Sequence, residues 1–273
     1  MSSHSRVRAL WPALAAAVAA GVAAEAARRV LTPRSALLDP VRVEVETYFS
    51  DEEIARGRRY ARPQLALLMT RSLIDAAVLA LIVRRPPRVL RRSWSTPAAG
   101  GAVTAAGLGL ALSLPTLPVR AVSRRRAMAV GLDTQSWGAW CRDLGKVSAI
   151  QTVFMAGGGA AVVALTRRFP RMWWAPLGVG SVAFGTGLAA LAPIVLDPIF
   201  NDFEPLPEGQ TRSDVLGLAR DAGVSVGEVY SVDASRRTTA ANAYVTGLGP
   251  TKRVVLFDTL LDRYQRDEIR LVV

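Results

Sequence analysis

Residues 98–119 read AAGGAVTAAGLGLALSLPTLPV, a stretch without a single charged side chain. An apolar segment of about 18 residues or more is long enough to cross the hydrocarbon core of a bilayer as a helix. A core helix of a soluble domain is usually shorter and keeps a polar face. This stretch therefore predicts a membrane-spanning helix, and it sets the class of fold for the chain around it.

Apolar stretches of similar length recur along the first 200 residues. We predict five spans, near residues 9–27, 65–83, 98–119, 147–166 and 173–196. The first span has the basic start of a cleaved signal peptide, but its length and the spans that follow favour a retained helix. The last three spans are rich in small residues, which let helix backbones approach closely in lipid: Gly107, Gly109, Gly157, Gly158, Gly159, Gly185 and Gly187.

The net charge of +12 comes almost wholly from arginine, because Lys146 and Lys252 are the only lysines. The arginines gather at the ends of the apolar stretches, within 84–92, 124–126 and 167–171. Charges in these places contact lipid headgroups and set the orientation of a membrane protein. The predicted partner is therefore the lipid bilayer, with no nucleic acid.

The composition changes after Pro198, where the pattern predicts one helix and then two or three strands: Glu208–Ala222 with Gly223 as its stop, Glu228–Asp233, Asn242–Leu248 and Arg253–Asp258. A further helix begins at Asp267. We therefore predict a mainly α protein, with a polytopic transmembrane helical bundle over 1–200 and the start of a small α+β domain over 201–273. An apolar helix cut in its first turns at Val273 leads us to expect the N-terminal part of a longer protein.

Two shorter segments carry helix signals outside the predicted spans. Ser50 is a suitable N-cap with Glu53 at the capping-box position, and it predicts a short interfacial helix ending near Tyr60. Residues 131–137 read as a loop that leads into another interfacial helix.

Several motifs follow one another in order along the chain. They are PIFNDFEPLPEG at 198–209, VDASRR at 232–237, NAY at 242–244, KRVVLFDTLL at 252–261 and DEI at 267–269. Upstream, YFS at 48–50, RPQ at 62–64 and QSW at 135–137 add to them. With these motifs the chain resembles the CAAX prenyl protease 1 family of membrane zinc metallopeptidases over roughly residues 40–273.

The resemblance implies a zinc metalloendopeptidase for the complete protein. In that family the helix after Asp-Glu-Ile carries His-Glu-x-x-His, whose histidines bind zinc while its glutamate activates water. By the family's spacing, the first of these histidines should fall about two residues beyond Val273. His4 is the only histidine of this chain. We therefore expect zinc in the complete protein, but no catalytic residue, metal ligand or bound zinc in this chain.

A serine or an aspartyl protease mechanism needs combinations of side chains that this sequence does not show. A serine nucleophile such as Ser181, which lies in the fifth span, has no histidine base to pair with. Asp197 has no second membrane aspartate in a recognisable motif, so an aspartyl dyad is unsupported.

The resemblance also points to substrate-binding residues on a strand before the zinc helix. Metalloproteases often hold substrate as an added strand on an exposed sheet edge. Alternation along the strand places Asn242 and Tyr244 on one face, so Asn242 is predicted to contact the substrate backbone and Tyr244 to line the cleft. The alternative is an ordinary strand that begins with a turn asparagine. Arg236 and Arg237 either attract a carboxylate-bearing substrate or are solvated loop residues.

In the second span, Arg71 and Asp75 are spaced for a pair across one helix turn. Ionisable groups at membrane depth usually face the interior of the bundle or a water-filled cavity. A structural ion pair or a snorkelling Arg71 is favoured over a contact with substrate.

The leading hypothesis is a membrane-embedded peptidase acting on a peptide or protein substrate, prenylated or not. The alternative is a non-enzymatic membrane scaffold or small-molecule carrier that lacks the metal motif. Loops on the side of the C-terminal segment hold fourteen Lys and Arg against ten on the other side. By the positive-inside rule this difference predicts an outer amino terminus and a cytoplasmic C-terminal segment, in the plasma membrane of a bacterium.

Overall fold

The computed structural model describes residues 18, 21–30, 44–88, 94 and 96–273. The chain forms two compact units, Met1–Ala55 and Arg56–Val273. In the first unit residues 21–30 are helical, and Arg28 and Arg29 both form ion pairs with Glu25. Most of the predicted span 9–27 lies outside the described residues.

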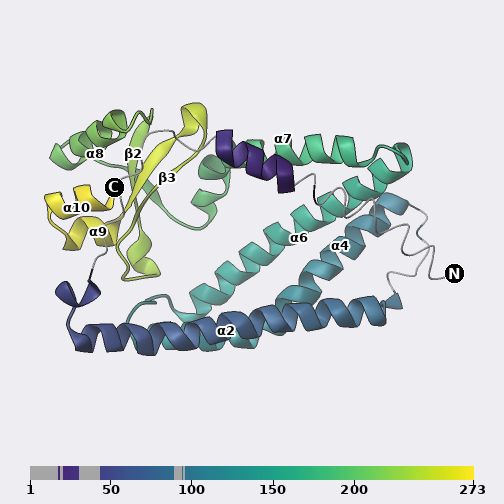
Figure 1. The fold of residues 1–273 in the computed structure, drawn as a ribbon, viewed down its shortest axis with the longest axis horizontal. Coiled ribbons are helices and arrows are strands. Elements are labelled where there is room, and N and C mark those ends of the chain that lie inside the picture. Colours follow the sequence, from purple (N-terminus) through teal and green to yellow (C-terminus); the bar gives the residue numbers. More distant parts are fainter. Residues whose placement is uncertain (1–17, 19–20, 31–43, 89–93, 95) are drawn as a thin grey trace. The chain divides into compact units, whose positions relative to one another are not determined.

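Four helical stretches in the described part are long and apolar enough to cross a membrane (Figure 1). They are α2 (Asp51–Arg84), α4 (Pro97–Ser113) continued through a 3-10 turn into α5 (Leu117–Ala129), α6 (Trp137–Arg168) and α7 (Trp174–Val195). These stretches contain the predicted spans 65–83, 98–119 and 147–166 and nearly all of 173–196. The predicted polytopic helical bundle is thereby confirmed.

Helix α2 differs from its prediction in length. The Ser50 N–H donates to the Glu53 carboxylate at 2.9 Å, and the Glu53 N–H lies 3.4 Å from the Ser50 hydroxyl, which forms the predicted capping box. From there the helix runs without interruption into the span, so the prediction of a separate interfacial helix ending near Tyr60 is wrong. Pro63 removes one backbone donor, but it does not end the helix.

Helix α6 shows the same behaviour. Ser136 caps it by accepting a hydrogen bond from the Ala139 N–H at 3.2 Å, and the helix continues from Trp137 to Arg168. The prediction of a loop before Trp137 is confirmed, whereas a separate interfacial helix is not observed. No Pro lies between Trp137 and the apolar part, so the helix has no reason to stop.

A four-stranded sheet follows the last membrane helix, with the strand order β1-β2-β4-β3. The strands are β1 (Phe203–Pro205), β2 (Glu228–Val232), β3 (Ala243–Thr246) and β4 (Arg253–Phe257). Strands β2 and β4 are parallel, and the other two pairs are antiparallel. The three predicted strands are confirmed, and β4 lies inside the sheet because its central residues are apolar and buried.

The two faces of the sheet have different neighbours. Helices α8 (Gln210–Asp221), α9 (Asp258–Arg263) and α10 (Arg266–Val272) gather on one face (Figure 1). The core there is formed by Val215, Val229, Val254, Leu256, Leu260 and Ile269. Val232, Ala234 and Val255 form a smaller apolar cluster on the other face. Gly223 ends α8 with a φ of +69°, as its position predicted.

Candidate functional site

Strand β3 is an edge of the sheet, since within the described residues it pairs only with β4. The Phe257 N–H donates to the Asn242 carbonyl at 3.0 Å. Because hydrogen bonds alternate along an antiparallel pair, Tyr244 turns its backbone groups toward β4, while Ala243 and Val245 turn theirs toward the free edge. Val245 is 55% exposed. The edge therefore presents backbone groups to which an extended peptide can add as a further strand.

Asn242 lies at the start of this edge and is exposed. Its side-chain oxygen accepts a hydrogen bond from the Ala243 N–H at 2.9 Å. The Ala243 N–H, which faces the free edge, is therefore already bonded, and the Asn242 side chain is held beside the strand. The Asn242 amide nitrogen has no hydrogen-bond partner among the described residues, so it is available to a ligand carbonyl.

Tyr244 is half-buried, and its ring meets that of Phe257 edge-on with centroids 6.2 Å apart. It lines a cavity of about 370 Å³ between the sheet and α6, together with Asp143, Val147, Phe200 and other residues. Burial, with a smaller contribution from Asp197, raises the pKa of the Tyr244 phenol. The phenol therefore stays protonated at neutral pH and can donate a hydrogen bond.

The structure places the two predicted residues differently. Tyr244 lines the cavity, whereas Asn242 is not among the residues that line it. Asn242 and Tyr244 thus belong to the same edge of the sheet, but only Tyr244 lines the cavity. Their roles as substrate contacts stay a prediction.

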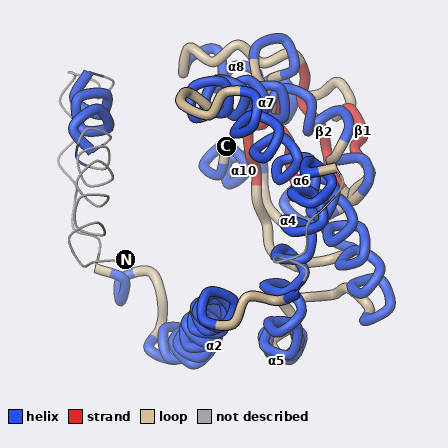
Figure 2. The backbone as a smooth tube through the Cα atoms, turned by 90° about the vertical axis from the view of Figure 1, so that its right-hand side faces the viewer, coloured by secondary structure: helices blue, strands red, loops and turns tan. Residues whose placement is uncertain are grey.

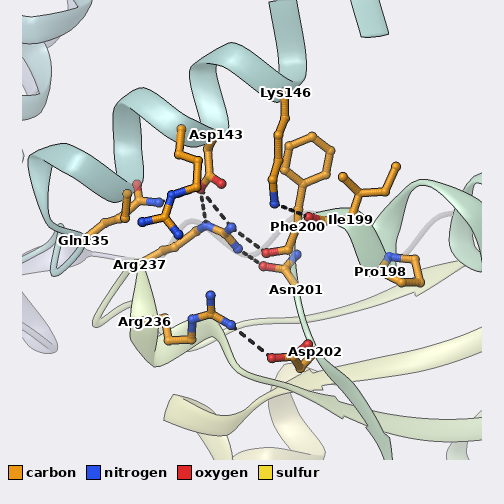
Figure 3. Close-up of a pocket in the computed structure, with 12 residues that line it drawn as sticks. Gln135, Asp143, Lys146, Pro198, Ile199, Phe200, Asn201, Asp202, Arg236 and Arg237 are labelled. Atoms are coloured by element: carbon orange, nitrogen blue, oxygen red, sulfur yellow. Dashed lines mark hydrogen bonds and ion pairs between the residues drawn. The ribbon is translucent and has the colours of Figure 1, made fainter. Parts of the chain in front are cut away.

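A polar cluster holds the sheet against α6 beside this cavity (Figure 3). The Arg237 guanidinium donates to the Asp143 carboxylate at 2.9 and 3.1 Å, and it also reaches Asn201 and the Phe200 carbonyl. Gln135 donates to the same carboxylate. Arg237 thus joins the loop before β3 to a membrane helix and to the segment after α7 through the hydrogen bonds of one guanidinium group.

Two further cations fasten the same segment. Arg253 at the start of β4 donates to the Pro193 carbonyl at 2.6 Å and lies over the ring of Phe203 at 4.6 Å. Lys146 of α6 donates to the Ile199 carbonyl at 2.7 Å. The α/β segment is therefore anchored to the ends of α6 and α7, which fixes β3 relative to these helices.

The two arginines before β3 behave differently from each other. Arg236 is exposed and forms ion pairs with Asp202 and Asp233, as a solvated loop residue can. Arg237 is part-buried and is held by the cluster around Asp143, so its interpretation as a solvated loop residue is wrong. The signal for this contact was Asp143 itself, a carboxylate in a membrane helix that requires a partner.

A metal centre needs several grouped ligands. Within residues 18, 21–30, 44–88, 94 and 96–273, no three His, Cys, Asp or Glu side chains are grouped to hold a metal ion. The described residues therefore do not fit a zinc centre by themselves, and no step through zinc can be assigned to them.

Two family models match consecutive parts of the chain. The model described as "CAAX prenyl protease N-terminal, five membrane helices" matches residues 37–202, and "Peptidase family M48" matches residues 205–273. A membrane bundle followed by a segment that matches a metallopeptidase family is the class defined by fold and sequence together. The chain belongs to the CAAX prenyl protease family and is an integral membrane protein.

Individual relatives agree with this family. A Bacillus subtilis protein named "Uncharacterized metalloprotease YhfN" is 33% identical over 168 residues, which cover 61% of this chain and 39% of that protein. CAAX prenyl protease 1 of Saccharomyces cerevisiae is 39% identical over 84 residues, or 30% of this chain and 18% of that protein. The chain thus matches well under half the length of these relatives.

A solved structure shares the fold. The crystal structure of S. mikatae Ste24p superimposes with a TM-score of 0.73 at 22% identity, and the match covers 85% of this chain and 57% of that chain. At this identity the likeness shows the fold alone. It supports the order of membrane helices followed by a small sheet that the structure describes.

Proposed function

We propose that the complete protein is an integral-membrane zinc metalloendopeptidase. In this proposal the present chain supplies the membrane domain, residues 1–200, and the first part of the peptidase domain, residues 201–273. Membership of the family and the metalloprotease name of the Bacillus relative support it. In the complete protein, zinc-activated water hydrolyses the peptide bond. The role of the present chain is to bind the substrate.

The observation that carries the proposal is the free edge of β3. Its outward backbone groups at Val245 can pair with any extended peptide, because backbone hydrogen bonds do not depend on side-chain identity. Asn242 has a free amide donor at one end of the edge, and the protonated Tyr244 phenol of the same strand lines the cavity between the sheet and α6. The proposed substrate class is accordingly an extended segment of a peptide or protein. C-terminal CAAX-type prenylated peptides, membrane proteins and misfolded proteins all contain such segments.

Replacing Asn242 by alanine is expected to lower kcat/KM of the complete protein for peptide cleavage about fivefold. One hydrogen bond to the substrate of ~1 kcal/mol is lost, and this energy corresponds to that factor. Folding and zinc content should stay intact, because Asn242 is exposed and makes no core contact. Peptidase kinetics, metal analysis and thermal unfolding of the variant test this. Unchanged kcat/KM would show that Asn242 does not contact the substrate and is an ordinary residue at the start of a strand.

The proposal includes an orientation in a bacterial plasma membrane, with the amino terminus outside and the α/β segment in the cytoplasm. The excess of arginine and lysine in the loops on the side of that segment supports it. Reporter fusions at Pro205 and at Arg88 should report the cytoplasm and the periplasm, respectively. A periplasmic signal at Pro205 would show that the orientation is reversed.

A further inference from the structure

A second cavity, of about 500 Å³, lies between α2, α5 and α6. Figure 2 shows α5 next to α2. The contact between these two helices is made by Gln64, whose amide donates to the Ser123 carbonyl at 3.1 Å, while the Ser123 hydroxyl donates back at 2.5 Å. The three helices belong to the stretches that can cross a membrane. The cavity is therefore formed mainly by the membrane bundle, and it shares no lining residue with the strand edge described above.

The lining of this cavity carries a net positive charge. Arg71, Arg120 and Arg124 line it, against a single carboxylate among the described lining residues, that of Asp133. Asp133 is already neutralised by Arg124, which it meets at 2.7 Å. Two arginines from different helices, Arg71 and Arg120, remain.

Asp75 of α2 attracts Arg120 electrostatically, but neither Arg71 nor Arg120 makes a close polar contact with a described residue. No hydrogen bond and no ion pair within 4.0 Å joins Arg71 or Arg120 to any described residue, so the predicted close pair of Arg71 with Asp75 is not formed. The Nε atom of Arg120 is fully buried and has no acceptor. The two guanidinium groups are close enough to repel each other electrostatically. A buried donor without an acceptor and two like charges beside one cavity both favour a bound anion.

The rest of the lining defines what kind of anion fits. Leu67, Leu68, Val119 and Leu144 give the cavity an apolar part beside the arginines. A small soluble anion would use only the charged part, whereas an amphiphile would use both. Arginine forks match phosphate oxygens in geometry, and basic pockets between membrane helices bind lipid headgroups.

We propose that this cavity binds an anionic phospholipid. The phosphate of the headgroup is held between Arg71 and Arg120, and the first part of an acyl chain lies along Leu67, Leu68 and Val119. The proposal does not depend on peptidase activity, because the cavity shares no residue with the β3 edge. Its effect is to join α2 to α5 through a shared anion.

The test is lipid retention by the complete protein, purified in detergent and measured by native mass spectrometry. Phosphatidylglycerol is compared with phosphatidylcholine of the same acyl chains. We expect at least about tenfold tighter retention of the anionic lipid, which corresponds to ~1.4 kcal/mol from two charge-assisted contacts. Arg120→Gln and, independently on the other helix, Arg71→Gln should abolish this preference. Arg125→Gln is the matched control, because Arg125 is exposed on α5 and does not line the cavity.

Thermal unfolding provides a second readout. Phosphatidylglycerol should raise the Tm of the wild type and of the Arg125→Gln variant, but not that of Arg120→Gln. Equal retention of both lipids by the wild type would overturn the proposal, and so would an equal loss of preference in the Arg125→Gln control. If inorganic phosphate binds the wild type and phosphatidylglycerol does not displace it, the site holds a soluble anion and the lipid assignment is wrong.

Discussion

Replacement of Gly159 by valine is expected to separate α6 from α4 and to destabilise the membrane bundle by about 3 kcal/mol or more. A Cβ at this position would lie 2.3 Å from the Gly101 carbonyl oxygen and 2.5 Å from the Ala105 Cβ. Both obstacles belong to the opposing helix, and one of them is backbone, so no side-chain rotation relieves the clash. The two helices would have to move apart, and they would lose the close contact that holds helices together in lipid.

The control for this change lies two positions earlier in the same helix. Gly157 would place a Cβ with no other heavy atom within 4 Å, so Gly157→Val should unfold close to the wild type. Gly101→Val should reproduce the defect from the other side, because its Cβ would lie 2.4 Å from the Gly159 carbonyl oxygen. The midpoint of denaturant unfolding in micelles measures all three variants. Equal midpoints for Gly159→Val and Gly157→Val would show that α4 and α6 do not pack as described.

The sequence predicted close helix packing but not the residues that make it. An abundance of glycine in the last three spans indicated that helices could approach closely, and Gly159 was among those residues. Its partner Gly101 was not singled out. A Cβ added at Gly107, Gly157 or Gly158 would have no neighbouring heavy atom within 4 Å, so these glycines are not needed for close packing. In a helix that is apolar on all sides, hydrophobic periodicity does not mark the face that meets another helix.

The boundaries of the elements show where local patterns are sufficient. Gly223 ended its helix as predicted, and the apolar strand β4 lies inside the sheet, because a positive φ and an apolar run are local properties. Strand β1 was not predicted, since it has three residues and one of them is Pro205. Its position depends on pairing with β2, which is a contact between distant parts of the chain.

The candidate site was predictable only in part. The pattern placed Asn242 and Tyr244 at a strand, and the structure shows that this strand is an edge. The contact of Arg237 with Asp143 joins residues far apart in the chain, so spacing could not reveal it. That the Ala243 N–H is left for the Asn242 side chain was also not visible, because the register between β3 and β4 decides which N–H groups bond within the sheet.

The central claim, that β3 receives the substrate as an added strand, makes a specific prediction about Val245. Its N–H faces the free edge rather than β4, so Val245→Pro removes a donor for substrate without removing a ladder bond within the sheet. The ring also obstructs an approaching strand. We expect kcat/KM of the complete protein for an extended peptide to fall about a hundredfold, which corresponds to ~2.7 kcal/mol.

Peptide cleavage by the Val245→Pro and Val245→Thr variants of the complete protein, with Tm and zinc content measured in parallel, is the most direct test. Val245→Thr keeps the N–H and the branched shape, so it should cleave the peptide at nearly the wild-type rate. Val245→Pro should retain its Tm and its zinc and lose cleavage. A folded, zinc-loaded Val245→Pro protein that cleaves the peptide as fast as the wild type would contradict binding along β3.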